Sequence, residues 1–279
     1  MRILHPTDFS TTAEHALDLA RDLRRRLDAE LHIVHVQQRF ESMSTHPYLQ
    51  PQLERLSPEL LRRLEEARKE EVDRLRNMLD HLASPDASAE LRWGEPLREL
   101  LEVAASADLV VMGAHGANRL DNYFVGGIAG RLVRRSPAPV ITVRDEVRSL
   151  QVGRILVATD FGEASHHAWD LCKKLARHGI KLVLAHVLDD AQVKDNPDYM
   201  NTVTDALDRL SSGVAERHMV REGNPATELP LAAEEVGADL IAIGIRRHST
   251  ALGLLLGSRA DMLIRSSPVP ILSVPQRPA

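Results

Sequence analysis

Short apolar runs alternate along this chain with longer stretches in which apolar residues recur at every third or fourth position. The runs "RILHP" from Arg2, "ELHIVHV" ending at Val36 and "DLVVMG" ending at Gly113 are typical of buried strands. Strands that alternate with helices predict a parallel sheet with helices on both faces. The first predicted helix follows Ser10 or Thr11, either of which can cap it, and its apolar positions are Ala13, Ala16, Leu17, Ala20 and Leu23.

The whole pattern occurs twice. "RILHPTDFSTTAEHALDLARDL" begins at Arg2, and "RILVATDFGEASHHAWDLCKKL" begins at Arg154. "RWGEPLRELLEVAASADLVVMG" is likewise matched by "REGNPATELPLAAEEVGADLIAIG", and both copies close on a short β-branched run. A repeat near half the chain length indicates a duplicated domain rather than a solenoid. We therefore predict two tandem α/β domains, residues 1–146 and 152–275, each with a five-stranded parallel sheet.

The first copy carries extra length around residues 47–84, where "SPELLRRLEEARKEEVDRLRNMLDHL" predicts a long, highly charged amphipathic helix. We expect this helix to lie in solvent over one face of the sheet. A helix that binds a partner is the alternative.

Composition narrows the class of protein. Hydrophobic residues make up 43% of the chain and charged residues 27%, which is ordinary for a soluble globular protein. The net charge of −5 and the aromatic content of 3% argue against nucleic acid as a partner, and no apolar run is long enough for a membrane span. The single cysteine, Cys172, forms no internal disulfide, so we expect a cytoplasmic protein.

Glycines cluster where a strand gives way to a helix. In the first copy Gly113, Gly116, Gly126 and Gly127 lie between "DLVVM" and "IAGRLVRRS". A loop from a strand end to a helix N-terminus offers free N–H groups and a positive dipole end, and glycine lets that backbone approach a phosphate. These glycines predict a phosphate cradle, although glycines at such positions can also serve turns alone.

The combination of "PTDFS", the "HV" that ends the second strand, the "GEP" loop and G-x2-G-x9-G before "SPAPV" resembles the universal stress protein family over both halves. The resemblance implies an adenine nucleotide alpha hydrolase-like, Rossmann-like fold with strand order 3-2-1-4-5. It implies that the aspartate and the valine contact the adenine side and that the glycine loop holds ribose and phosphates. It also implies two subtypes, one that binds ATP and one that does not, and pairing of domains through their last strands.

The resemblance implies one nucleotide site in each copy. In copy one Gly127 stands where the family has Ser or Thr, which removes a hydroxyl and should weaken binding rather than abolish it. In copy two Arg247 replaces the second glycine, where it could block the cradle or contact a phosphate. The predicted site residues are Pro6, Thr7, Asp8, Val36, Gly113, Gly116, Gly126 and Gly127 in copy one, and Asp160, Val187, Gly244, Arg247, Gly257 and Ser258 in copy two.

Other residues offer less chemistry. Asp8 and Asp160 could instead cap the helices that follow them, and His35 and His186 are expected to be packed core residues. No spacing supplies the three or four converging ligands of a zinc site, so we expect no metal beyond Mg²⁺ carried with ATP. No nucleophile lies beside a base, so we expect at most slow ATP hydrolysis and no other enzymatic activity.

These observations predict a stress-response protein that binds ATP or another adenine nucleotide in its first domain, with a degenerate site in its second. A scaffold of the same family that binds no nucleotide is the alternative, and an enzyme acting on a small phosphorylated or adenylated compound is a third. We expect the two copies to form an internal pseudo-dimer. Two chains could associate further, and the protein partner is unknown.

Overall fold

A computed structural model describes residues 1–38, 57–115, 127–144, 150–188, 199–246, 248–250, 253–255 and 257–276. The first domain runs through nine elements in alternating order. They are β1 (Arg2–Pro6), α1 (Thr11–Leu27), β2 (Glu30–Gln37), α3 (Pro58–Ala83), β3 (Ser88–Trp93), α4 (Pro96–Ala104), β4 (Leu109–Gly113), α5 (Gly127–Arg135) and β5 (Val140–Val143).

The second domain repeats this order and adds a small antiparallel hairpin, formed by β10 (His248–Thr250) and β11 (Gly253–Leu255), before its last helix. Its other elements are β6 (Arg154–Ala158), α6 (Glu163–Ala176), β7 (Lys181–Leu188), α8 (Tyr199–Ser211), β8 (Arg217–Glu222), α9 (Pro225–Val236), β9 (Leu240–Ile245), α10 (Ser258–Ser266) and β12 (Ile271–Pro275). The prediction of an α/β fold with two domains is confirmed.

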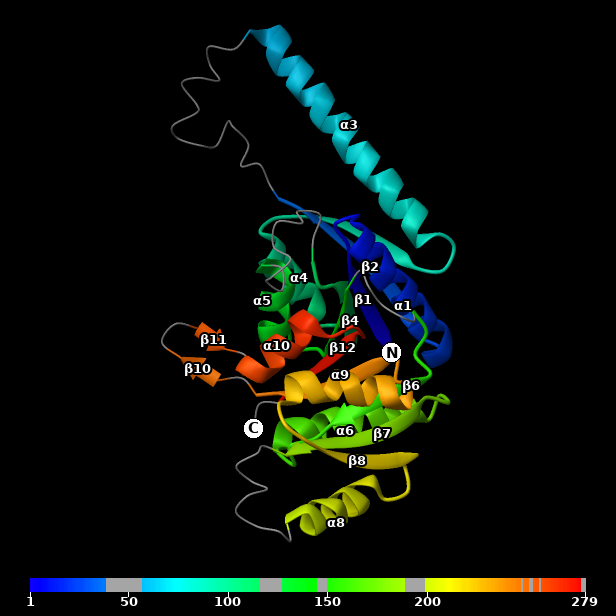
Figure 1. Ribbon diagram of the computed structural model, residues 1–279. Helices are drawn as coiled ribbons and strands as arrows, with labels where there is room; N and C mark the ends of the chain where they lie inside the picture. Colours follow the sequence, from blue (N-terminus) through cyan, green and yellow to red (C-terminus); the bar gives the residue numbers. More distant parts are fainter. Residues whose placement is uncertain are drawn as a thin grey trace.

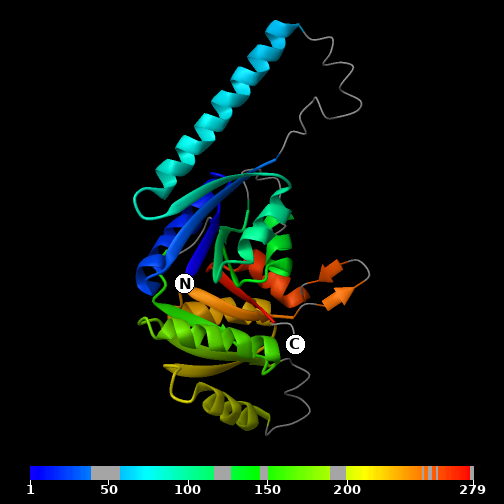
Figure 2. The same ribbon diagram turned by 180° about the vertical axis from the view of Figure 1, so that it is seen from behind.

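One 10-stranded sheet passes through both domains, in the order β3-β2-β1-β4-β5-β12-β9-β6-β7-β8. Within each domain the pairing is parallel, and β5 and β12 meet antiparallel at the seam, with Ile141 opposite Leu272. The two domains are therefore joined edge to edge through their last strands, as Figures 1 and 2 show.

Two hydrophobic layers cover the sheet, and each is shared by both domains. One layer packs α1, the C-terminal end of α3, α6 and α8 on the first face, and the other packs α4, α5, α9 and α10 on the second. The nearly wholly apolar β1, β4, β6 and β9 lie inside because they are covered on both faces.

Polar contacts also cross between the domains. The buried Asp22 carboxylate on α1 accepts from the backbone N–H of Val152, 3.1 Å away, ahead of β6. Arg134 on α5 forms an ion pair of 2.9 Å with Asp261 on α10. These contacts lie on the two opposite helical layers and help to hold the seam in one geometry.

The helix α3 differs from what we expected. Side chains 59–71 are all exposed, and only the C-terminal part packs on the body, through Leu75, Leu79 and Ala83. In both views the N-terminal half of α3 extends away from the sheet (Figures 1 and 2). The expectation that this helix covers a sheet face is therefore wrong for its exposed half.

Among the described residues, no helix combines the length and the apolar character that crossing a membrane requires.

Candidate functional site

The loop between β1 and α1 holds Asp8 in a defined position. Phe9 adopts a left-handed backbone with φ of 60°, and its N–H donates to the Thr7 hydroxyl at 3.1 Å. The Asp8 carboxylate accepts from the N–H and the hydroxyl of Ser10, at 3.1 and 2.5 Å. Ser10 in turn caps α1 by accepting from the N–H of Ala13 at 3.2 Å. The cap is therefore Ser10, and the exposed Asp8 supports the cap instead of replacing it.

The second domain builds the same loop. Phe161 has a φ of 57° and donates to the Thr159 hydroxyl at 3.0 Å, and Asp160 accepts from the N–H of Gly162 at 2.9 Å. Gly162 occupies the cap position of α6 without a side-chain bond. Two independent copies of this strained turn show that its geometry is built into the Thr-Asp-Phe sequence.

A histidine on the neighbouring strand supports each turn. His35 Nδ1 bonds the carbonyl of Thr7 at 2.8 Å, and its ring lies 4.7 Å from that of Phe9. His186 Nδ1 bonds the carbonyl of Thr159 at 2.7 Å, and its ring lies 4.9 Å from that of Phe161. His186 is buried and His35 half-buried, so packing was the right expectation, but both also fix the turn. Burial lowers the pKa of His186 in spite of its bond to the carbonyl and the nearby Asp160.

Gly113 and Gly244, the first glycines of the two patterns, lie against helix backbone. A Cβ on Gly113 would lie 3.1 Å from the Thr12 side chain and 3.2 Å from the Ala13 nitrogen. A Cβ on Gly244 would lie 2.2 Å from the backbone of Ala164. Each of these glycines therefore lets a strand end pass close to the first turn of α1 or α6.

The strand ends bring part of the predicted site together. Pro6 pairs with Val34 across β1 and β2, so Asp8 and Val36 lie at the same edge of the sheet, and β4 on the other side of β1 ends there at Gly113. This is the carboxyl edge, where open parallel sheets bind ligands. In the second domain β6, β7 and β9 bring Asp160, Val187 and Gly244 to the equivalent edge.

The phosphate side of the predicted site is only partly described. Gly127 begins α5 and Ser258 begins α10, and both are exposed. Among the described residues, a Cβ on Gly127 would meet only the Arg131 guanidinium, 4.0 Å away, and a Cβ on Gly257 would meet nothing within 4 Å. Gly116, Gly126 and Arg247 lie outside the described residues.

Arg246 reaches the turn after the first strand of the second domain, a contact that the sequence analysis did not predict. Its guanidinium forms an ion pair of 2.6 Å with Asp160 and would lie 2.3 Å from a Cβ on Gly162. Burial acts to raise the pKa of Asp160, but bonds from Gly162 and Ser165 and the charge of Arg246 outweigh it, so this pKa is lowered. The aligned residue of the first domain is His115, which lies two positions after Gly113 as Arg246 lies two positions after Gly244.

His5 is a further difference between the domains, since Val157 takes its place in the second. Its side chain is fully buried in β1, and Nδ1 bonds the carbonyl of Val111 at 2.9 Å. Nε2 is buried without a hydrogen-bond partner. Burial lowers the pKa of His5 to about 4, although the bond to the Val111 carbonyl opposes the shift. The imidazole is therefore neutral at physiological pH.

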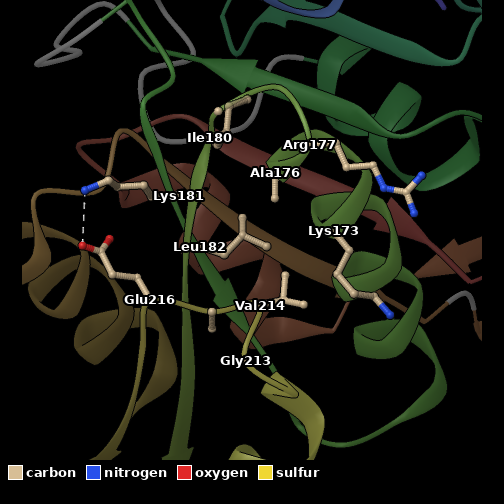
Figure 3. A pocket seen from close by; sticks show the side chains of 11 residues that line it. Lys173, Ala176, Arg177, Ile180, Lys181, Leu182, Gly213, Val214 and Glu216 are labelled. Carbon is tan, nitrogen blue, oxygen red and sulfur yellow. Dashed lines mark hydrogen bonds and ion pairs between the residues drawn. The ribbon is translucent and has the colours of Figure 1, made fainter.

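A hollow of about 690 Å³ lies at the other end of the second domain (Figure 3). Lys173 borders it from α6 and Arg177 from the C-cap of that helix, and on the opposite side Lys181 points away from them toward Glu216, its ion-pair partner at 3.4 Å. Because Lys181 begins β7, this hollow is at the amino edge of the sheet and is no part of the nucleotide site predicted from the sequence.

No group of three or more His, Cys, Asp or Glu side chains that could hold a metal ion occurs in the part of the chain that the structure describes. The Cys172 thiol is buried, and burial raises its pKa far above the usual range, which leaves it unreactive.

Comparison with known proteins places this architecture in one family. The sequence matches the universal stress protein family over residues 1–144 and again over 151–275. This chain belongs to the universal stress protein family, as a member with two tandem domains.

Individual relatives show how far the likeness extends. A universal stress protein of Mycolicibacterium smegmatis is 25% identical, with 99% of this chain and 97% of that protein covered. One from Mycobacterium tuberculosis is 25% identical over 66% of this chain and 67% of its own length. The crystal structure of a universal stress protein from Archaeoglobus fulgidus superposes with a TM-score of 0.72 at 21% identity, covering 99% of this chain and 98% of that one.

Proposed function

We propose that this universal stress protein holds ATP or another adenine nucleotide in its first domain and that the second domain is closed to it. The observation that carries the proposal is the difference between two equivalent strand edges. Arg246 binds Asp160 and covers Gly162 in the second domain, whereas the aligned residue in the first is His115.

The first domain offers suitable chemistry at each end of such a ligand. Asp8 and the backbone of Val36 can meet the base and the ribose, because both lie at the carboxyl edge beside the end of β4. The first turn of α5, which begins at Gly127, contains no acidic residue, so its N–H groups and dipole favour a phosphate. The first turn of α10 contains Asp261.

A magnesium ion would enter with the nucleotide, held by phosphate oxygens and water. We expect hydrolysis to be slow at most, because the His35 imidazole beside this turn is already bonded to the Thr7 carbonyl and to Gln37. Nucleotide occupancy would bias the association of the protein with a partner.

The experiment compares two aspartates at equivalent positions. Freshly purified wild type, Asp8→Ala and Asp160→Ala are denatured, and the released nucleotide is quantified per chain by chromatography and mass spectrometry. We expect about one adenine nucleotide per wild-type chain, a loss of at least tenfold in Asp8→Ala, and no change in Asp160→Ala. Equal retention by both variants contradicts the assignment to the first domain.

A scaffold that binds no nucleotide is the second candidate function. One observation favours it, namely that the N-terminal half of α3 exposes Leu60, Leu61 and Leu64. A wild-type chain that releases no nucleotide and shows no thermal shift with millimolar ATP supports the scaffold and rejects nucleotide binding.

A further inference from the structure

A second cavity of the first domain lies outside the nucleotide site proposed above. It has a volume of about 200 Å³ and is found where α1 meets the C-terminal part of α3 (Figure 1). We call it the α1–α3 slot. Its lining residues are Thr7, Phe9, Ala13, Glu14, Leu17, Met78, His81 and Leu82.

One difference between the two domains falls on a residue that lines the slot. Leu17 on α1 aligns with Trp169 on α6 in the quoted copies. The Trp169 side chain is only 2% exposed and is among the largest buried side chains of the chain. The second domain thus places an indole ring in its core at the position where the first has a smaller leucine beside an open space.

The slot and the predicted nucleotide site draw on different hydrophobic layers of the sheet. Phe9 and Leu82 pack against the hydrophobic layer of α1 and α6, whereas Val36 packs against the layer of α4 and α5. Thr7 is the one residue that lines the slot and also belongs to the predicted nucleotide site. A ligand in the slot would therefore be a second ligand, separate from the nucleotide.

The walls of the slot suit a flat apolar ring. Phe9, Leu17, Met78 and Leu82 supply the apolar surface, and an apolar cavity of roughly 150 Å³ is enough to hold benzene. Met78 adds a polarizable sulfur that packs well against aromatic rings.

Two polar side chains complete the slot. Glu14 and His81 are both exposed, and neither side chain makes a hydrogen bond or ion pair with another described residue. The Glu14 carboxylate is an acceptor for an N–H group on a bound ring. The slot would thus combine apolar walls with one acceptor, the Glu14 carboxylate, which orients the polar edge of the ligand.

We propose that the α1–α3 slot binds a small flat aromatic molecule with one N–H donor, of the indole class. The inference does not depend on nucleotide binding. Because Met78, His81 and Leu82 belong to α3, occupancy of the slot would also strengthen the attachment of the projecting helix to the body.

The probe is 5-fluoroindole, followed by its ¹⁹F NMR line width and shift, which the two tryptophans of the chain do not obscure. We expect saturable binding to the full-length wild type with a Kd in the millimolar range or tighter. Leu17→Trp, which supplies the second-domain side chain, should weaken binding at least tenfold. Trp169→Leu should keep the first site and add a second equivalent.

Two results overturn the proposal: no saturable binding to the wild type up to the solubility limit of the probe, or affinity in Leu17→Trp within twofold of wild type. Thermal unfolding of each variant establishes that it is folded. If Leu17→Trp does not fold, Met78→Trp fills the mouth of the slot from the half-buried face of α3 and must produce the same loss of binding.

Discussion

The two domains have the same architecture and nearly the same turn after their first strands, yet their interiors and strand ends differ. Thr-Asp-Phe adopts the same left-handed geometry twice, and a histidine supports it twice. Around that shared turn, Arg246 aligns with His115, Trp169 with Leu17 and Val157 with His5. The backbone geometry of the turn is therefore the same in both domains, whereas the side chains around it differ.

The largest effect we expect comes from the tightest contact between strand and helix. Gly244→Ala should lower the free energy of unfolding by about 3 kcal/mol or more, because its Cβ would overlap the backbone of α6, which cannot move as a flexible side chain can. Gly113→Ala should cost only about 1 kcal/mol, since its contacts of 3.1 and 3.2 Å need a small shift.

Urea unfolding of both variants measures this difference. Equal losses of stability, or a larger loss in Gly113→Ala, would show that α1 and α6 do not approach their strands as differently as the structure indicates.

A second difference between the domains should appear as acid sensitivity. The pKa of His5 is about 4 in the folded chain, whereas an unfolded histidine titrates near 6.5. The unfolded state therefore binds more protons between these values, so the contribution of His5 is complete above about pH 6.5 and is lost as the pH falls toward about 4. Near pH 5 the loss should be about 2 kcal/mol.

His5→Val, which copies the second domain, removes this proton uptake. Its free energy of unfolding should depend less on pH than that of the wild type between pH 6.5 and 4.5. Unfolding curves that stay parallel for both proteins across this range would contradict the assignment.

Exchanging the residues that follow the fourth strands tests the proposed closure of the second site. Arg246→His removes the guanidinium from Asp160 and should raise nucleotide affinity in the second domain about tenfold, since a charged partner no longer competes. His115→Arg should reduce nucleotide retention in the first domain by a similar factor.

Both variants are assayed by the nucleotide released per chain and by titration with ATP. The ion pair is exposed, so Arg246→His should change the free energy of unfolding by no more than about 1 kcal/mol. A second domain that stays empty after this substitution assigns the block to another residue.

The sequence alone predicts the alternation of strands and helices and the duplication, because apolar periodicity and internal repeats report directly on them. The resemblance to the family supplies the aspartate and valine at the strand ends. Neither the sequence pattern nor the resemblance predicts the direction in which a long side chain points. The glycine pattern singles out Arg247, whereas the contact with Asp160 is made by Arg246, whose guanidinium turns toward it.

The packing of α3 and the presence of the slot could not be predicted from the sequence, for related reasons. Charge and periodicity predict that residues 58–83 are helical, but they do not show which turns pack on the body, and α3 packs only from Leu75 onward. An alignment displays the volume difference between Leu17 and Trp169 but does not show that a space lies open beside Leu17.

Because β5 and β12 join two domains of one chain, the sequence of each domain can change independently, which is not possible for two identical subunits. In a symmetric dimer one codon change alters both binding faces together, so neither face can be lost alone. Here the two domains are encoded separately, and one continuous sheet still joins them. If the second domain is closed as proposed, it can serve as a permanent, non-responding neighbour of the domain that binds nucleotide.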